Sequence, residues 1–365
     1  MPSLHLDIMR RKKGEGMNKI ERTEMSADWF ERLMGFRERG YEDTRRQMEV
    51  IGHRLRSRVN GESYGIGTLE HVSLQTLRER AQSGGGRPGR LKVSVVSGDV
   101  RQLHQCTEHA GALFQVASQF KLLEMVSPDV TPECGVTGYQ YDKTQGPACA
   151  MAAGAATIYR NYFAPIGNEM GQTRTRQFDG LADLGAALAD GIGQPVESLW
   201  EMRNGYALCS RAGLDAIADY LETLTPAQFD ELRGKLRIGV HSDVEVTDCE
   251  GPDCPIVSQA FCSALPVAYC DTHGESWNWE PFATLVLDSL YEATLLASVC
   301  NAQRGTSNQV LLTRVGGGVF GNDDEWIHRA MRRALNMVKG FDIDVRIVSY
   351  GTPSRQIVQL EDEFL

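Results

Sequence analysis

The sequence predicts an α/β fold in which a largely parallel or mixed β-sheet is covered by helices on both faces. Short Val-rich segments alternate along the chain with longer segments of helical character. One apolar segment, Phe282–Cys300, is too long for a strand and has the length of a buried helix. Another segment, Gln309–Val315, is strand-like and runs directly into a glycine-rich loop and an amphipathic helix. This alternation favours a sheet that is buried on both faces.

Two regions precede the main series of strands. Apolar residues recur at helical spacing between Trp29 and Leu55, which predicts helices there. The segment Ser83–Gly89 is rich in glycine and has the composition of a flexible joint. We therefore divide the chain into an N-terminal helical extension, residues 1–90, and a main domain, residues 91–365. The main domain contains a helical insertion at about residues 161–235.

The main domain supplies strands and helices in alternation. The expected strands are Leu91–Val96, Ala112–Val116, Leu236–Val246, Ile256–Ala264, Gln309–Val315 and Val345–Tyr350. The expected helices are Pro147–Tyr162, Phe282–Cys300 and Asp323–Lys339. The first of these helices is rich in alanine, and proline suits its first turn. Asn322 is the expected cap of the last one.

Composition excludes several classes of function. A formal net charge of -10 argues against general affinity for nucleic acid, which requires clustered Lys and Arg. We find neither an apolar run of membrane-spanning length nor the apolar stretch of a signal peptide, and we expect a cytoplasmic protein. The basic segment Arg10–Lys13 is either a solvated tail or a weak targeting or binding tag.

The cysteines indicate a reduced protein. The chain has nine of them, an odd number, and they are scattered from Cys106 to Cys300. Cys249 and Cys254, with His241 and His273, leave a zinc site open, although their spacing does not match a paired zinc-binding pattern. We therefore expect neither a metal nor another cofactor, and a cysteine- or zinc-dependent enzyme is the weakest of the alternatives.

Two loops have the character of anion-binding sites. Gly316–Gly321 follows a strand and precedes a helix, and consecutive glycines let backbone N–H groups approach a phosphate closely, as a nest at positive φ. Gly146–Gly154 opens the Ala-rich helix, whose N-terminus favours a negative ligand. A plain flexible turn and a tightly packed helix are the structural alternatives. In an α/β sheet, such loops meet beyond the carboxyl ends of the strands.

The order of short motifs resembles the macrodomain family over roughly Leu91–Tyr350. The motifs, in chain order, are Gly98-Asp99-Val100, Ala112–Ser118, Gly146–Gly154, Gly205-Tyr206-Ala207-Leu208, the strand with His241, and Gly316–Gly321. The helical start and the insertion resemble the divergent branch of MavL-type ADP-ribosyl hydrolases. The resemblance implies a macrodomain-like three-layer fold and an ADP-ribose cleft.

The resemblance also implies the ligand-binding residues. These are Asp99, Val100, Gln115, Ser118, Gln119, Gly146, Pro147, Ala148, Gly316, Gly317, Gly318, Val319, Phe320 and Tyr350. In the family, the residue at Asp99 hydrogen-bonds the adenine, and the two glycine-containing loops hold the diphosphate and distal ribose. Tyr350 would lie against the adenine, where an aromatic ring can stack on a purine; an ordinary core tyrosine is the alternative.

One departure from the family concerns the distal ribose. Typical members use two asparagines there, whereas this chain has Gln115 and Ser118, with Gln119 or Asp142 as substitutes. Glu124 and Asp142, in the loops after Ser118, are further candidates near the ribose.

Catalytic carboxylates are expected at the end of the strand Leu236–Val246. Alternation places His241, Asp243 and Glu245 on one face, and burying such polar groups is costly without a function. We therefore expect Asp243, Glu245 and Asp248 to activate water and stabilise charge at the ribose. The alternative is an edge strand that shows this face to water. Asp323, Asp324 and Glu325 are explained by the helix dipole.

Two functions follow from these assignments. The first is an ADP-ribosyl hydrolase that removes ADP-ribose from modified protein side chains, arginine among them, because carboxylates pair well with a guanidinium. The second is a non-catalytic module that binds ADP-ribose or a related nucleotide. The expected partner is ADP-ribose or an ADP-ribosylated protein, with neither nucleic acid nor membrane.

Overall fold

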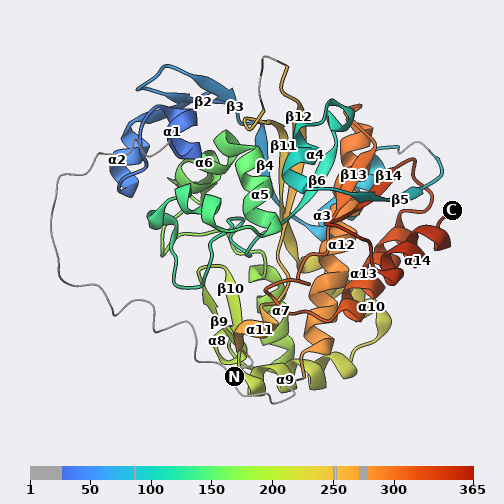
Figure 1. The fold of residues 1–365 in the computed structure, drawn as a ribbon. Helices are drawn as coiled ribbons and strands as arrows, with labels where there is room; N and C mark the ends of the chain where they lie inside the picture. The colour runs from blue at the N-terminus through green and yellow to red at the C-terminus, as the bar shows by residue number, and fades with distance from the viewer. Residues whose placement is uncertain (1–26, 86–87, 250, 252, 271–277) are drawn as a thin grey trace, which may run out of the picture.

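The computed structural model describes residues 27–85, 88–249, 251, 253–270 and 278–365 (Figure 1). The basic segment Arg10–Lys13, Gly86 and Arg87 of the expected joint, and His273 lie outside the described residues.

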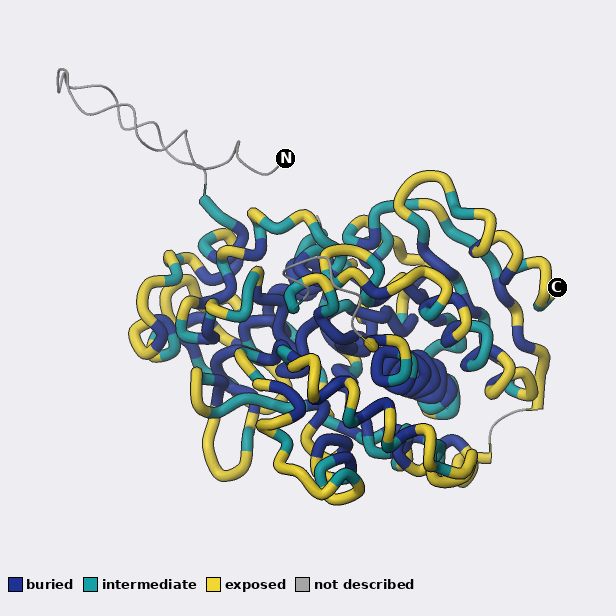
Figure 2. The backbone as a smooth tube through the Cα atoms, turned by 90° about the horizontal axis from the view of Figure 1, so that it is seen from below, coloured by how far each residue is buried: buried dark blue, intermediate teal, exposed yellow. Residues whose placement is uncertain are grey.

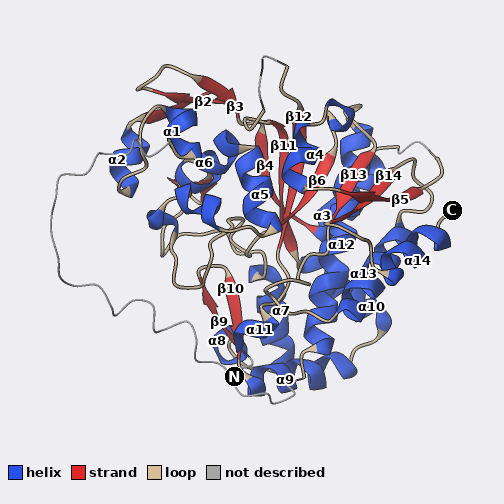
Figure 3. Cartoon of the chain, in the orientation of Figure 1, coloured by secondary structure: helices blue, strands red, loops and turns tan. Residues whose placement is uncertain are grey.

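A seven-stranded mixed sheet forms the centre of the fold, in the order β4-β11-β12-β6-β13-β14-β5 (Figure 3). Its strands are β4 (Thr68–Ser73), β11 (Arg237–Glu245), β12 (Ile256–Cys262), β6 (Leu113–Ala117), β13 (Gln309–Leu312), β14 (Asp344–Ser349) and β5 (Lys92–Ser97). Neighbours from β12 to β5 pair in parallel, whereas β11 is antiparallel to both β12 and β4. The predicted fold class, a mixed sheet flanked by helices, is confirmed.

Helices cover both faces of this sheet, and its central strands β6 and β12 are buried on both sides. On β6, Leu113 belongs to the core that α12 (Glu280–Gln303) shares, while Phe114 and Val116 pack in the core that includes residues of α5 (Gln145–Ala152). The first layer contains α12, α3 (Leu74–Ser83) and α13 (Asp324–Met337). The second contains α4 (Val100–Gln105), α5 and α6 (Gly154–Tyr162). The buried residues are dark blue in Figure 2.

Helix α12 is the buried helix that the sequence predicts. By length and composition it could cross a membrane, but 94% of its most apolar window is buried inside the protein. It contacts β6, β11, β12 and β13 and packs against α3 and α13. Its apolar surface is therefore covered by the protein itself, as in the central helix of a globular fold.

The described part of the segment before residue 90 is only partly helical. It contains α1 (Trp29–Met34) and α2 (Tyr41–Arg46), followed by a three-stranded sheet of β1 (Met48–Ile51), β2 (Arg54–Ser57) and β3 (Ser63–Gly65). The expectation of a helix through Leu55 is therefore wrong, because Gly52, at φ 59°, reverses the chain between β1 and β2. Strand β4 and α3 then join the main sheet and the helical layer over it, although the sequence assigned them to the extension.

Residues 161–235, the predicted insertion, contain helices and two small hairpins. Its elements are β7 (Pro165–Ile166), β8 (Glu169–Met170), α7 (Ala182–Ile192), α8 (Val196–Leu199), β9 (Trp200–Arg203), β10 (Tyr206–Cys209), α9 (Arg211–Glu222) and α10 (Pro226–Lys235). The remaining elements are η1 (Thr107–His109), η2 (Pro132–Cys134), η3 (Thr137–Tyr141), α11 (Val267–Cys270) and α14 (Arg355–Glu363). The expected helix Pro147–Tyr162 is interrupted at Ala153, which has φ -112° and ψ 59°.

Candidate active site

Two adjoining cavities lie where the parallel strands of the sheet end. The first has a volume of about 290 Å³, and the second has a volume of about 690 Å³. They share five lining residues: Ala117, Asp142, Thr144, Gln145 and Arg314. Ligands of α/β sheets bind at this edge, beyond the carboxyl ends of the strands. We therefore treat the two cavities as halves of one cleft.

The glycine loop forms one wall of the first cavity, through Gly316, Gly318, Val319 and Phe320. The N–H groups of Gly318, Val319 and Phe320 donate to no backbone acceptor among the described residues. They are available to an anion. Gly317 lines neither cavity, and its N–H donates to the Arg314 carbonyl within the loop.

The geometry of this loop differs from the expected nest. Within it only Gly316 (φ 90°) and Gly321 (φ 71°) have positive φ. Asn322 does not cap the following helix; its side chain donates to the carbonyls of Leu265 (2.8 Å) and Gly316 (3.2 Å) and fixes the loop's exit. Asp323 is the actual cap of α13.

The N-terminus of α5 forms the opposite wall. Gly146 and Pro147 line the first cavity, and Ala148 lines the second. A Cβ on Gly146 would lie 2.0 Å from the carbonyl oxygen of Ala117, so only glycine allows α5 to start this close to the end of β6. The Gln145 side chain accepts from Ala117 N (2.7 Å) and fixes the same contact. The positive end of the α5 dipole is thus directed at the cleft.

Arg314 is a cleft residue that the sequence patterns did not indicate. It lines both cavities, and its partly exposed guanidinium forms an ion pair with Asp324 of α13. The available signal was its position, between the end of β13 and the glycine loop. A cation at the junction of the cavities, between two sets of backbone N–H groups, suits a diphosphate.

The second cavity brings together Asp99, Val100 and Tyr350, as the resemblance implies. Asp99 caps α4 by accepting from Arg101 N (2.8 Å). Tyr350 is 88% exposed, which rules out the core-tyrosine alternative. Ile357 of α14 adds an apolar contact surface. A flat apolar group such as a purine fits this combination.

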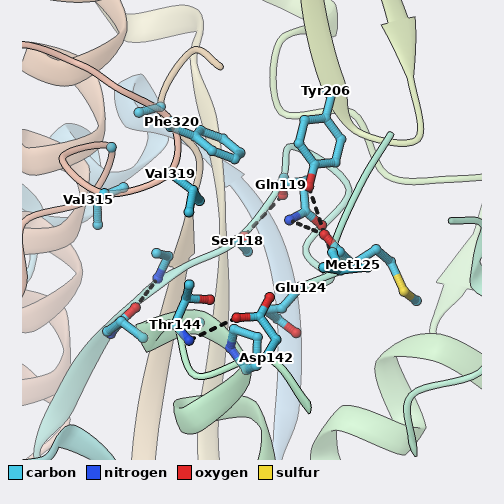
Figure 4. Close-up of a pocket in the computed structure, with 18 of the residues that line it drawn as sticks. Ser118, Gln119, Glu124, Met125, Asp142, Thr144, Tyr206, Val315, Val319 and Phe320 are labelled. Atoms are coloured by element: carbon cyan, nitrogen blue, oxygen red, sulfur yellow. Dashed lines mark hydrogen bonds between the residues drawn. The ribbon is translucent and has the colours of Figure 1, made fainter. Parts of the chain in front are cut away.

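Glu124 and Asp142 are the carboxyl groups of the first cavity (Figure 4). Asp142 is half-buried at the junction of the cavities and accepts from Thr144 N (2.8 Å). Glu124 is buried, and its Oε1 has no hydrogen-bond partner among the described residues. Figure 4 shows both on the side of the cavity opposite Phe320 and Tyr206. Two carboxyl groups in different environments suit separate roles in acid-base chemistry.

Buried cations accompany Glu124. Its Oε2 lies 3.4 Å from Nη2 of Arg160, whose guanidinium stacks on Phe261 at 3.8 Å. Burial raises the pKa of Glu124 to about 7, against the opposing effect of Arg160. Burial also lowers the pKa of the Lys121 ammonium to about 7. Glu124 can therefore exchange a proton near neutral pH, as a general acid or base requires.

Three polar residues of the expected ribose site have different positions. Ser118 and Gln119 line the first cavity. The Gln119 side-chain amide donates to the Met125 carbonyl (3.0 Å) and accepts from the Met125 N–H (2.8 Å). These two hydrogen bonds fix the loop that carries Glu124. Gln115 lines neither cavity: it is buried on the α12 face of β6 and bonds Thr294 (3.1 Å). Gln115 is therefore a structural residue, and its assignment to the ligand is corrected.

The structure does not bring the expected catalytic carboxylates to the cleft. Strand β11 runs antiparallel to β12, so the carboxyl end of β11 points away from the carboxyl ends of the parallel strands, where the cleft lies. Asp243 pairs with Arg304 (2.8 Å), Glu245 accepts from Gly65 N (2.6 Å), and Asp248 pairs with Arg101 (2.9 Å).

The expected common face on β11 is absent as well. A register shift between His241 and Val244 breaks the alternation, and Asp243 has φ 59°. His241 is buried and bonds the Ile66 carbonyl (2.7 Å), whereas Asp243 is exposed. The catalytic assignment of these strand-end carboxylates is therefore corrected.

The cysteine expectations are also revised. Cys249 and Cys254 form a disulfide in the structure, so these two are not the reduced thiols that the sequence indicates. Among the described residues, no group of three or more His, Cys, Asp or Glu side chains could hold a metal ion.

An aromatic cluster closes the first cavity. Tyr206 of β10, Tyr269 of α11 and Phe320 of the glycine loop have ring centroids 5.2 to 5.7 Å apart. All three line the cavity, and Tyr206 and Phe320 lie across from the carboxyl groups (Figure 4). The faces of aromatic rings attract cations, and carboxylates form ion pairs with cations. This end of the cleft is therefore suited to a cationic group.

The lining of the cleft suits an anionic ligand with a flat ring at one end, and carboxyl groups lie at the other end. The sequence matches no family model and no curated protein. Among solved structures, poly(ADP-ribose) glycohydrolase from Deinococcus radiodurans with ADP-ribose is similar over 81% of this chain and 94% of that one (13% identity, TM-score 0.42). Poly(ADP-ribose) glycohydrolase from Thermomonospora curvata is similar over 89% of this chain and 96% of that one (13% identity, TM-score 0.41).

Proposed function

We propose that this protein is an ADP-ribosyl hydrolase that removes ADP-ribose from modified protein side chains. The observation that carries the proposal is Glu124, a buried carboxyl group with an unpartnered oxygen among the described residues, beside two anion-binding loops. Burying an ionisable group costs free energy, and binding of ADP-ribose alone gives no reason to place one here. Acid-base chemistry does give such a reason.

The shape and chemistry of the cleft support ADP-ribose as the ligand. The second cavity offers Tyr350 for the adenine and Asp99 for a polar edge of the base. Arg314, the glycine-loop amides and the α5 N-terminus suit the diphosphate. The distal ribose would then lie in the first cavity, with its C1″ carbon toward the carboxyl groups.

The two carboxyl groups suit the two halves of the hydrolysis. The bond between C1″ and the leaving atom breaks, and the protonated Glu124 donates its proton to that atom. Asp142, at the junction of the cavities, stabilises the positive charge that develops on the ribose and accepts a proton from the attacking water. The water oxygen bonds to C1″, and the leaving atom departs with the electron pair of the broken bond and the proton from Glu124, so that a hydroxyl leaves neutral and an arginine leaves as its guanidinium.

We further propose arginine as the modified residue. The guanidinium would lie between the carboxyl groups and the ring cluster of Tyr206, Tyr269 and Phe320. Cation–π contact and carboxylate pairing both favour a planar cation there. A serine or glutamate linkage offers neither interaction.

The experiment incubates the protein with substrates that carry ADP-ribose on arginine, serine or glutamate, and it measures the release of free ADP-ribose. We expect release from arginine and much slower release from the other two. Tight binding of ADP-ribose without release from any linkage would contradict hydrolysis and support a binding module. Release from serine or glutamate but not from arginine would contradict the arginine assignment alone.

A further inference from the structure

The carboxylate of Glu38, between α1 and α2, receives hydrogen bonds from three donors in other parts of the chain. The N–H of Val136 lies 2.9 Å from both of its oxygens, and the N–H of Thr137 lies 2.7 Å from Oε2. The Tyr162 hydroxyl donates to Oε1 at 2.7 Å. Charge-assisted bonds of this kind are stronger than neutral ones. The segment of residues 132–142 is thus tied to the N-terminal extension.

This segment reaches the first cavity at two points. The Tyr139 hydroxyl lies 2.9 Å from the backbone N of Glu124, and Asp142 follows at the end of η3. Both proposed reactive carboxyl groups therefore depend on the path of residues 132–142. The Trp29 ring nitrogen also donates to the Thr137 carbonyl at 3.2 Å, from the same extension.

The contact is closely fitted. Gly135 has φ 81°, and a Cβ at that position would lie 2.3 Å from the Glu38 carboxyl carbon. Tyr162 is fully buried, and burial together with the Glu38 carboxylate raises its pKa, so the hydroxyl keeps its proton and donates. The carboxylate thus occupies a place shaped by a glycine, two amides and a phenol.

The extension packs against the same region through apolar contacts. One core cluster joins Trp29, Phe30 and Met34 of α1 with Val136 and Tyr139 of the segment. The aromatic residues of the extension therefore pack on the main domain, and Glu38 adds a directed polar contact to that packing.

We propose that Glu38 is a positioning residue for hydrolysis: it fixes residues 132–142 and so places Asp142 and Glu124 in the first cavity. The inference rests on the proposed hydrolase function. The adenine contacts come from other loops, at β5 and β14, and the diphosphate contacts come from the loop after β13 as well as from the N-terminus of α5, which follows this segment. Loss of the Glu38 contacts should therefore reduce turnover much more than it reduces ADP-ribose binding.

The test compares Glu38→Gln with Glu31→Gln in the full chain. The introduced amide cannot accept all three hydrogen bonds, because one carboxylate oxygen is replaced by an NH2 donor. Glu31 lies in α1 and its carboxylate pairs with Arg37, so its variant removes the same charge from the same extension without touching residues 132–142. We expect kcat to fall on the order of tenfold to a hundredfold in Glu38→Gln, as for a small misplacement of reacting groups.

The expected split is that the Kd for ADP-ribose changes by less than about threefold while kcat falls. Hydrogen exchange of the amides of residues 136–142 should speed up in Glu38→Gln and not in Glu31→Gln. Gly135→Ala, which pushes a Cβ against the same carboxylate, should reproduce both effects.

Two results would overturn the inference. One is an unchanged kcat and unchanged exchange in Glu38→Gln. The other is a parallel loss of kcat, ADP-ribose affinity and thermal stability, which would indicate general destabilisation. If the unsubstituted protein releases no ADP-ribose, the hydrolase proposal fails instead, and the exchange data still report whether Glu38 orders this segment.

Discussion

Replacing Glu124 by Gln removes the only proton that the buried carboxyl group can exchange, while its shape is kept. Glu124 is 2% exposed, and its Oε1 has no partner among the described residues. Since the proposed mechanism uses the protonated form as a general acid, the variant should lose about 10²- to 10⁴-fold in kcat. In the unsubstituted protein, kcat should fall about tenfold for each pH unit above about 7, the pKa of Glu124. The small residual activity of the variant should lack this dependence.

The same group predicts a change in stability. Raising the pKa of Glu124 from 4.5 to about 7 corresponds to about 3 kcal/mol, at ~1.4 kcal/mol per pH unit. Below pH 4.5 both the folded and the unfolded chain hold this proton. Between about pH 4.5 and 7 only the folded chain holds it, so its contribution to stability falls as pH rises. Above pH 7 this contribution is lost.

The assay is urea unfolding of both proteins between pH 4.5 and 8, with kcat measured over the same range. The difference in unfolding free energy between them isolates Glu124 from His71 and His104, whose lowered pKa values of about 4 affect stability in the same window. Lys121 contributes only above pH 7, because below it both states are protonated. A pH-independent difference, or a Gln variant that retains its activity, would refute the role of Glu124.

Three other predictions concern the cleft. Gly146→Ala should lower ADP-ribose affinity by at least about tenfold in calorimetry, because its Cβ would lie 2.0 Å from the Ala117 carbonyl; Gly138→Ala, which meets open space, is the control and should bind normally. Arg314→Ala should weaken ADP-ribose binding by about tenfold and reduce its salt dependence, as titrations at two ionic strengths would show. Asp243→Asn should keep kcat within about twofold in a turnover assay, whereas a large loss would restore its catalytic assignment.

Much of the fold could be predicted because burial leaves a strong pattern. Strands β5, β6, β12 and β14 are short segments rich in Val and other apolar residues, and α12 is a long, mostly apolar and buried helix, so the sequence predicts each of them. The N-terminal strands could not be recognised in the same way. They are short, and their apolar residues alternate with arginine and glutamate at spacings that also suit a helix.

The sequence predicts those parts of the candidate site in which backbone groups line the cleft. The glycine loop and the α5 N-terminus follow from glycine and helix-start signals, but the reactive carboxyl groups do not. Asp243 was preferred because strand direction is invisible in sequence, and β11 is antiparallel. Glu124 belongs to an irregular loop whose path depends on Gln119 and on distant Arg160, so no local pattern gave it priority.

Calorimetric titration with ADP-ribose, compared with ADP, AMP and NAD, tests whether the cleft binds ADP-ribose. The two cavities and Arg314 predict one site per chain, with ADP-ribose bound at least about tenfold more tightly than AMP, because AMP reaches only the second cavity and part of the diphosphate site. The Tyr350→Ala variant should weaken ADP-ribose and AMP alike, since both would use the adenine contact. Absence of ADP-ribose binding, or equal affinity for AMP, would contradict the account.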